Sequence, residues 1–174
     1  MQLIRPTLDL LPHYLAAIRG GWPPSLRDGA AEAELAALAL DAGAVIRRLN
    51  DAGANGGDVR GFTRWLWDGA FCGRIAFRYL PGSAAPPPAS SGHIGYGVVP
   101  AKQGNGYARS ALQQLLEEIA PLGLPHVALT TDPANIASQR VIIANGGVRA
   151  GEETHPTGVP LLTWHIALRT SSNG

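Results

Sequence analysis

The sequence predicts a single mixed α/β domain built around one sheet. Segments with strand character come both before and between segments with the periodicity of amphipathic helices, which favours neither an all-α nor an all-β fold. The chain has 174 residues, enough for one domain with a real core and too few for two comfortable ones. Hydrophobic residues make up 45% of the chain and charged residues 16%, proportions typical of a globular protein. We therefore expect residues 1–174 to form one domain.

A short strand and a helix come first. Residues 3–5 have strand character, and Pro6 ends this strand because proline lacks the N–H that a sheet needs. We expect it at the edge of the sheet, where a short strand before a proline is tolerated. Residues 9–19 have the apolar spacing of a helix, with Thr7 or Asp9 as its N-cap.

A long helix and a hairpin follow. Residues 30–50 are rich in Ala and Leu and predict a helix with a break at Gly43. In residues 62–80, aromatic and β-branched side chains surround a central Asp68-Gly69 dipeptide. This dipeptide is a strong signal for a tight turn between antiparallel strands.

The next unit runs from a strand through a glycine-rich loop into a helix. Residues 93–99 predict a strand that ends at Pro100, and two glycines flank Asn105 just beyond it. The following apolar residues recur at helical spacing, so one face of this helix is expected on the core. These residues are Ala108, Ala111, Leu112, Leu115, Leu116 and Ile119.

The last part of the chain predicts a buried strand, a helix and a closing hairpin. Residues 126–131 are the strand, and the helix follows with Asp132 as cap, Pro133 in the first turn and Gly146 as its stop. Residues 148–169 then provide two strands with a turn between them.

The glycine loop needs a chemical explanation. A helix N-terminus carries unpaired N–H groups and a partial positive charge, and glycines let a bulky anion approach them. No Lys follows Gly104 and Gly106 as a P-loop requires. A dinucleotide fold is also disfavoured, because Arg109 stands where its third glycine would be and no acidic residue lies at the right distance.

One known family matches this loop and its surroundings. Gln103, Gly106 and Ala108 have the spacing Q/R-x-x-G-x-G/A, with a strand directly before and an amphipathic helix directly after. Asn135 and Ser138 begin a second segment, NIASQRVIIANGG. Together these resemble the pyrophosphate loop and the second motif of the GNAT superfamily of acyl-CoA-dependent N-acetyltransferases. The resemblance is close over residues 71–147 and weaker in the first sixty residues.

The resemblance implies a V-splayed mixed sheet with helices on both faces, acetyl-CoA as co-substrate and an amine as acceptor. The pantetheine arm would lie in the split between residues 94–99 and 126–131. The backbone N–H of Val98 would stabilise the thioester oxyanion. The implied CoA-binding residues are Tyr96, Gly97, Val98, Gln103, Gly104, Asn105, Gly106, Tyr107, Ala108, Arg109, Asn135 and Ser138.

The chain departs from the family at the proton donor. Many GNAT enzymes have a tyrosine seven residues after the asparagine, and Ile142 stands there instead. Strand side chains alternate, so Tyr96 shares a face with Val98 while His93 has the opposite face. In better-known members of the family, base residues on this strand lie an even number of positions before the oxyanion-hole residue. The resemblance therefore favours Tyr96 over His93 as the group that moves the proton, although a bulge in the strand would reverse the parity. The alternative, in which Tyr96 only packs in the sheet, stays open.

Other functional classes have weak support. The net charge of +1 suggests no nucleic-acid partner, and no stretch reaches the length of a membrane span. The start of the chain does not resemble a signal peptide, so we expect a cytoplasmic protein. Cys72 has no histidine beside it and is interpreted as a structural thiol, and no metal site is expected. Lys102 is the only lysine, which we attribute to composition.

The acceptor is not determined by the sequence. Residues 20–30, 80–92 and 155–160 are expected to line its site, with Trp22, Arg27 and Arg78 as candidate contacts. The acceptor could be a small molecule or a peptide, and a homodimer is left open. Two alternatives to an enzyme remain: a CoA-binding sensor or scaffold without chemistry, and a structural subunit.

Overall fold

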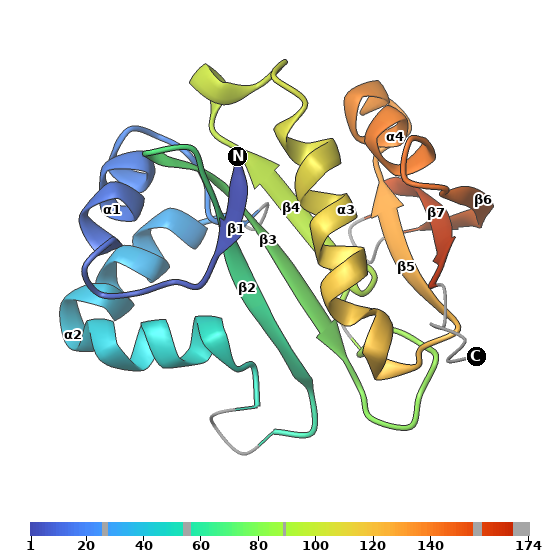
Figure 1. The fold of residues 1–174 in the computed structure, drawn as a ribbon, viewed down its shortest axis with the longest axis horizontal. Helices are drawn as coiled ribbons and strands as arrows, with labels where there is room; N and C mark the ends of the chain where they lie inside the picture. The colour runs from blue at the N-terminus through green and yellow to red at the C-terminus, as the bar shows by residue number, and fades with distance from the viewer. Residues whose placement is uncertain (26–27, 54–56, 89, 155–157, 169–174) are drawn as a thin grey trace.

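The computed structural model describes residues 1–25, 28–53, 57–88, 90–154 and 158–168. Within these residues, seven strands and four α-helices are interspersed along the chain (Figure 1). In chain order they are β1 (Gln2–Ile4), α1 (Leu11–Arg19), α2 (Ala30–Asn50), β2 (Arg60–Trp67), β3 (Phe71–Tyr79), β4 (Ile94–Val98), α3 (Tyr107–Ile119), β5 (His126–Thr131), α4 (Ile136–Ile143), β6 (Val148–Thr154) and β7 (Pro160–Ala167). Short 3-10 turns at Pro100–Lys102 and Ala120–Leu122 flank α3. The predicted mixed class is confirmed.

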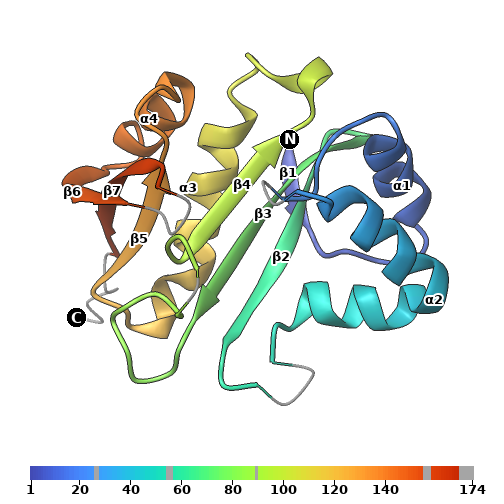
Figure 2. The ribbon, with the colours of Figure 1, turned by 180° about the vertical axis from the view of Figure 1, so that it is seen from behind.

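The expected single sheet is divided into two. One has four strands in the order β1-β2-β3-β4, the other three in the order β5-β7-β6, and every pairing within them is antiparallel. A bridge between Gly92 and Leu129 joins the two sheets, and the His93 N–H donates to the Ala128 carbonyl at 2.7 Å beside it. Beyond this junction β4 and β5 run in the same direction and separate toward their carboxyl ends (Figure 1 and Figure 2).

Helices cover both faces of the four-stranded sheet, as predicted. Side chains alternate along β2, so Trp65 lies in the cluster formed with α1 and α2 while Leu66 lies in the cluster formed with α3. The stripe of α3 explains its position, because Ala111, Leu112, Leu115 and Ile119 are fully buried. Burying a leucine or isoleucine contributes roughly 1.5–3 kcal/mol, so this face holds the helix against the sheets.

The helix starts and breaks differ from the predictions. Neither Thr7 nor Asp9 caps α1, which begins after Leu10 with no side-chain cap, and a proline lies in its first turn. The break in α2 falls at Asp41 (φ −155°, ψ 91°) and not at Gly43. The Asp41 carboxylate accepts the N–H of Ala44 at 2.8 Å, so it caps the second half of the helix.

The cap of α4 was also predicted wrongly. Asn135 is the N-cap and its side chain accepts the N–H of Ser138, whereas Asp132 and Pro133 lie before the helix. Asp132 instead accepts the N–H of Ala134 at 2.6 Å and closes the turn that leads into α4. Gly146 has a φ of 82° just beyond the helix, which suits its predicted role as the stop.

Both predicted hairpins are confirmed. β2 and β3 pair across the turn at Asp68-Gly69, and β6 and β7 pair near the end of the described chain. Within the described residues, no helix combines the length and apolar character that crossing a membrane requires.

Candidate active site

The loop before α3 presents a row of unused backbone donors. Gly104 and Gly106 have φ values of 79° and 73°, which only glycine adopts readily. The N–H groups of residues 104–109 make no hydrogen bond within the described chain, and the first to do so is that of Ser110, to the Gly106 carbonyl at 3.1 Å. These groups lie at the positive end of α3, so the loop can bind a large anion such as a pyrophosphate.

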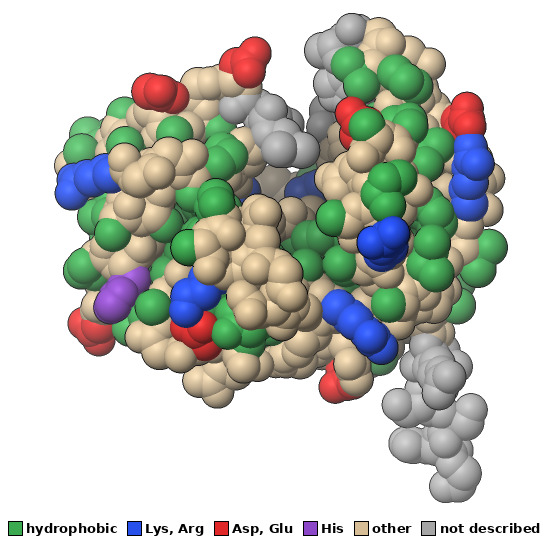
Figure 3. Space-filling view, turned by 90° about the horizontal axis from the view of Figure 1, so that it is seen from above, with side chains coloured by type: hydrophobic (Ala, Val, Ile, Leu, Met, Phe, Trp, Pro, Cys, Tyr) green, Lys and Arg blue, Asp and Glu red, His purple; other side chains and the backbone are tan. Residues whose placement is uncertain are grey.

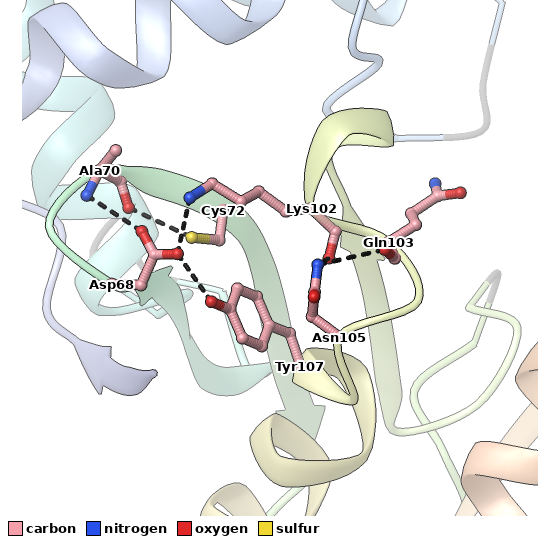
Figure 4. A network of polar contacts seen from close by, with 7 residues as sticks. All are labelled: Asp68, Ala70, Cys72, Lys102, Gln103, Asn105 and Tyr107. Atoms are coloured by element: carbon pink, nitrogen blue, oxygen red, sulfur yellow. Dashed lines mark hydrogen bonds and ion pairs between the residues drawn. The ribbon is translucent and has the colours of Figure 1, made fainter.

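Side chains of the same loop hold its shape. The Asn105 amide donates to the carbonyls of Lys102 and Gln103 at 3.1 and 3.2 Å (Figure 4). The Gln103 amide donates to the Val98 carbonyl at 3.1 Å and ties the loop to β4. The side chains of Gln103 and Asn105, two of the predicted CoA-binding residues, are therefore engaged by carbonyls of the protein itself. This leaves the backbone of the loop to face a ligand.

A carboxylate from the β2–β3 turn fixes the loop from the other side. Asp68 accepts hydrogen bonds from the Lys102 ammonium and the Tyr107 hydroxyl, both at 2.7 Å (Figure 4). These bonds, that from Lys102 first, lower the pKa of Asp68 well below its usual range. We call Asp68, Lys102 and Tyr107 the Asp68 cluster.

Sequence reasoning missed this cluster. Lys102 was attributed to composition, yet it flanks the glycine loop and pairs with a residue of the predicted turn. The sole lysine beside the loop was the available signal, but only folding brings it to a residue 34 positions away.

The edge of β4 that faces the split carries free backbone groups. Paired residues of antiparallel strands alternate between hydrogen-bonded and non-hydrogen-bonded pairs. Val99 donates to the Cys72 carbonyl at 2.9 Å, so Val98 and Tyr96 belong to the other kind of pair with β3. Their N–H and C=O groups therefore point away from β3, toward the split. Since Gln103 occupies the Val98 carbonyl, the N–H groups of Val98 and Tyr96 are the donors along this edge.

The Tyr96 side chain reaches across the split to α4. Its hydroxyl lies 2.7 Å from the Ser138 hydroxyl and 3.3 Å from the Ser138 carbonyl. Burial raises the pKa of Tyr96, and the Ser138 hydrogen bond offsets part of that rise, so the phenol stays protonated at neutral pH. Asn135 is engaged as the N-cap of the same helix. Ile142 is fully buried and has no polar atom to contribute.

The opposite face of β4 carries no side chains, because glycines occupy positions 95 and 97. Two of the predicted acceptor contacts lie against it. A Cβ added at Gly97 would lie 3.6 Å from the Trp22 ring, and one added at Gly95 would lie 3.8 Å from the Arg78 guanidinium. Figure 3 shows a hollow between the two lobes of the molecule, with basic side chains at depth. Arg27 lies outside the described residues, as does His155 of the third predicted acceptor segment.

Cys72 and His93 are occupied by structural contacts. Cys72 is fully buried, its thiol donates to the Ala70 carbonyl at 3.3 Å, and burial is the main cause that raises its pKa to about 11. His93 is also fully buried, and its Nδ1 accepts the N–H of Ala128 at 2.9 Å. Burial lowers the pKa of His93, which makes it a poor base. Within the described residues, no group of three or more His, Cys, Asp or Glu could hold a metal ion.

Three features come together here: two sheets that separate, a helix N-terminus that can bind an anion, and a free edge of β4 that faces the split. This combination is typical of an enzyme of the acyl-transfer class. The chain belongs to the GNAT acetyltransferase family, because the family model for the acetyltransferase (GNAT) domain matches residues 18–148. GNAT acetyltransferases use acetyl-CoA as donor. The match covers β4, the glycine loop and α4, so all residues of the candidate site lie within it.

Solved structures share the fold at low sequence identity. A protein described as a GNAT-family acetyltransferase from Bordetella pertussis has a TM-score of 0.64 at 17% identity, covering 95% of this chain and 94% of its own. A variant of the spermidine N-acetyltransferase SpeG from Vibrio cholerae has a TM-score of 0.66 at 12% identity, covering 99% and 98%. The microcin C7 self-immunity acetyltransferase MccE, solved in complex with acetyl-CoA and AMP, has a TM-score of 0.64 at 15% identity, covering 95% and 91%. No curated protein matches the chain.

Proposed function

We propose that this protein is an N-acetyltransferase that passes the acetyl group of acetyl-CoA directly to an amine, on a small molecule or a peptide, in a ternary complex. The observation that carries the proposal is the row of free N–H groups at residues 104–109 beside the open edge of β4. The free N–H groups of the loop suit the pyrophosphate of CoA, and the unpaired edge of the strand directly before the loop suits the amide-bearing arm of the same molecule.

In this proposal the backbone of β4 binds and polarises the thioester. The N–H of Tyr96 would pair with an amide of the pantetheine arm, as an added strand would. The N–H of Val98 would donate to the thioester oxygen while negative charge develops on it. Both donors belong to a strand paired with β3 on its other side, so they are held in place before the reaction begins.

Tyr96 would supply the proton for the departing thiolate. As the amine nitrogen forms its bond to the carbonyl carbon, the C–S bond breaks, and the Tyr96 hydroxyl protonates the sulfur. The proton that the nitrogen loses then returns to the Tyr96 phenolate, directly or through Ser138 and water, and restores the hydroxyl. A raised pKa keeps this hydroxyl protonated at neutral pH, as a general acid requires. Ser138 holds the hydroxyl at the α4 side of the split and can pass a proton back to it.

An acyl-enzyme on Cys72 is disfavoured. The nucleophile in such a route is the thiolate, and the Cys72 thiol is buried with a pKa of about 11. A direct attack by the bound amine needs no nucleophile from the protein, only a geometry that holds amine and thioester together.

The test is a panel of amines with acetyl-CoA, followed by the release of free thiol and by mass spectrometry of the acetylated product. We expect amine-dependent release, initial rates that fit a ternary complex, and Cys72→Ala retaining most of the activity. Binding of acetyl-CoA without turnover of any amine would favour a CoA sensor instead. Ping-pong kinetics or an acetyl group on Cys72 would overturn the direct route.

A further inference from the structure

On the face of β3 and β4 opposite the Tyr96 side chain, β4 carries only glycines, and we call this strip of the sheet the acceptor trough. Its floor is made of small residues, and arginines stand at two points along it. By strand register, Ala76 pairs with Gly95 and Arg74 pairs with Gly97, while the Arg78 N–H donates to the His93 carbonyl. The residues of this acceptor trough are Arg74, Ala76, Arg78, Gly95 and Gly97.

Two observations place the trough on the α1 side of the sheet. Trp22, which packs with α1 and α2, lies 3.6 Å from the Cβ position of Gly97, so its ring forms one wall. Burial and Glu34 raise the pKa of Tyr14, a residue of α1, and the positive charge of Arg74 acts in the opposite direction. Arg74 therefore lies near the Tyr14 hydroxyl on that side. Its partner in the strand register is Gly97, the residue before Val98, whose N–H is free.

Arg74 has no acidic partner in the part of the chain that the structure describes. Every Asp and Glu of the chain is among the described residues, and none of their ion pairs includes Arg74. Glu34, which like Arg74 acts on the pKa of Tyr14, is already engaged by the Tyr14 hydroxyl and the Arg48 guanidinium, both at 2.9 Å. Arg74 is half-buried, and a charge that is partly removed from water without a partner has an energetic cost that the fold alone does not explain.

We propose that the acceptor amine carries an anionic group, a carboxylate or a phosphate, which Arg74 binds while the amine reaches the thioester beside Val98. This inference rests on the function proposed above and names its substrate class. A guanidinium binds either anion through two parallel hydrogen bonds. Gly95 and Gly97 bring no side chain to this face of β4, and Trp22 and Arg78 lie opposite them and would contact the body of the acceptor. A polyamine would bring further positive charge against Arg74 and is therefore a poor acceptor.

Four amines of different charge test the inference with the full-length protein and saturating acetyl-CoA. They are beta-alanine with a carboxylate, phosphoethanolamine with a phosphate, ethanolamine with no anion, and spermidine with additional positive charge. We expect kcat/KM for at least one anionic amine to exceed that for ethanolamine by about tenfold or more, since hydrogen bonds to charged groups are the strong ones. The comparison of the first two shows which anion is preferred.

Substitutions at Arg74 then separate recognition from folding. Arg74→Gln should lower kcat/KM for the anionic amine by about tenfold or more and leave it unchanged for ethanolamine, with Arg74→Lys between the two. Arg149→Gln is the matched control, because Arg149 is exposed on β6 and pairs with Glu152. The rise in melting temperature with acetyl-CoA should be the same in both Gln variants.

The outcomes distinguish the two proposals. If ethanolamine or spermidine is the best acceptor, or if Arg74→Gln keeps the preference for the anionic amine, the inference is wrong while the acetyltransferase proposal stands. If no amine in this set or in a wider panel of peptides is acetylated although acetyl-CoA binds, both proposals are wrong.

Discussion

Gly106 and Gly123 offer a matched test of the anion-binding loop. They lie before and after α3, their φ values are 73° and 72°, and a Cβ added at either would meet no atom within 4 Å. Replacement by valine therefore introduces no clash, only the strain of a left-handed backbone. That strain is about 1–2 kcal/mol for a residue with a side chain, and more for a β-branched one. We expect Gly106→Val and Gly123→Val to lower the free energy of unfolding by similar amounts.

Their effects on acetyl-CoA binding should differ. In Gly106→Val the loop would favour a conformation that no longer points its N–H groups at one anion, so binding would have to restore the strained conformation. A penalty of about 1–2 kcal/mol corresponds to about five- to thirtyfold weaker binding. The strain at position 123 is the same with and without ligand, so Gly123→Val should bind acetyl-CoA as the parent protein does.

Calorimetric titration gives the dissociation constants, and denaturant unfolding gives the stabilities. Gly106→Asn is a useful intermediate, because asparagine tolerates the left-handed region and keeps the N–H. The reasoning fails if Gly106→Val binds acetyl-CoA like the parent protein, or if both valine variants lose affinity equally.

Four further predictions address other parts of the site. Tyr96→Phe should lower kcat by about tenfold or more with little change in acetyl-CoA affinity; Tyr79→Phe, on the neighbouring strand, is its control, and equal rates in the two variants would exclude Tyr96 as the acid. Asp68→Asn should raise the dissociation constant of acetyl-CoA and leave kcat at saturation unchanged, because the Asp68 cluster fixes the loop and does not touch the thioester. Cys72, with a pKa of about 11, should react slowly with iodoacetamide in the folded protein and faster as the pH rises; rapid labelling at neutral pH would contradict its burial. Burial lowers the pKa of His93, so its contribution to stability should be complete above about pH 6.5 and be lost as the pH falls below that value; His93→Asn should reduce this acid dependence in denaturant unfolding.

Local sequence determined the parts of the fold that depend on backbone preference. Glycines at 104 and 106 adopt positive φ values that other residues resist, so they mark the start of α3 without reference to the rest of the chain. The Asp68-Gly69 turn and the apolar stripe of α3 are equally local signals, and both predictions are confirmed. The resemblance to the GNAT superfamily, which rested on the glycine loop with its flanking strand and helix and on the segment that begins at Asn135, is confirmed at the level of the family by the family match.

Competition between nearby polar residues was not resolved by sequence. Asp132 and Asn135 are both good caps, and in the fold Asn135 caps the helix while Asp132 closes the turn before it. In α2 the break was predicted at Gly43 but lies at Asp41. The Asp41 carboxylate accepts the N–H of Ala44, and this bond replaces a backbone hydrogen bond that the break removes. Such choices depend on how well the remainder of each helix packs.

Only the tertiary structure decided which side chains meet at the site. Tyr96 and Ser138 are 42 residues apart, and Asp68 and Tyr107 are 39 apart, so no spacing rule along the chain predicts their contacts. The alternation of β4 gave the face on which Tyr96 lies, but its partner depends on how the second sheet splays from the first. The contact of Gly97 with Trp22 likewise depends on how α1 and the loop after it pack against the sheet, because a glycine in a strand lets another group approach the backbone closely.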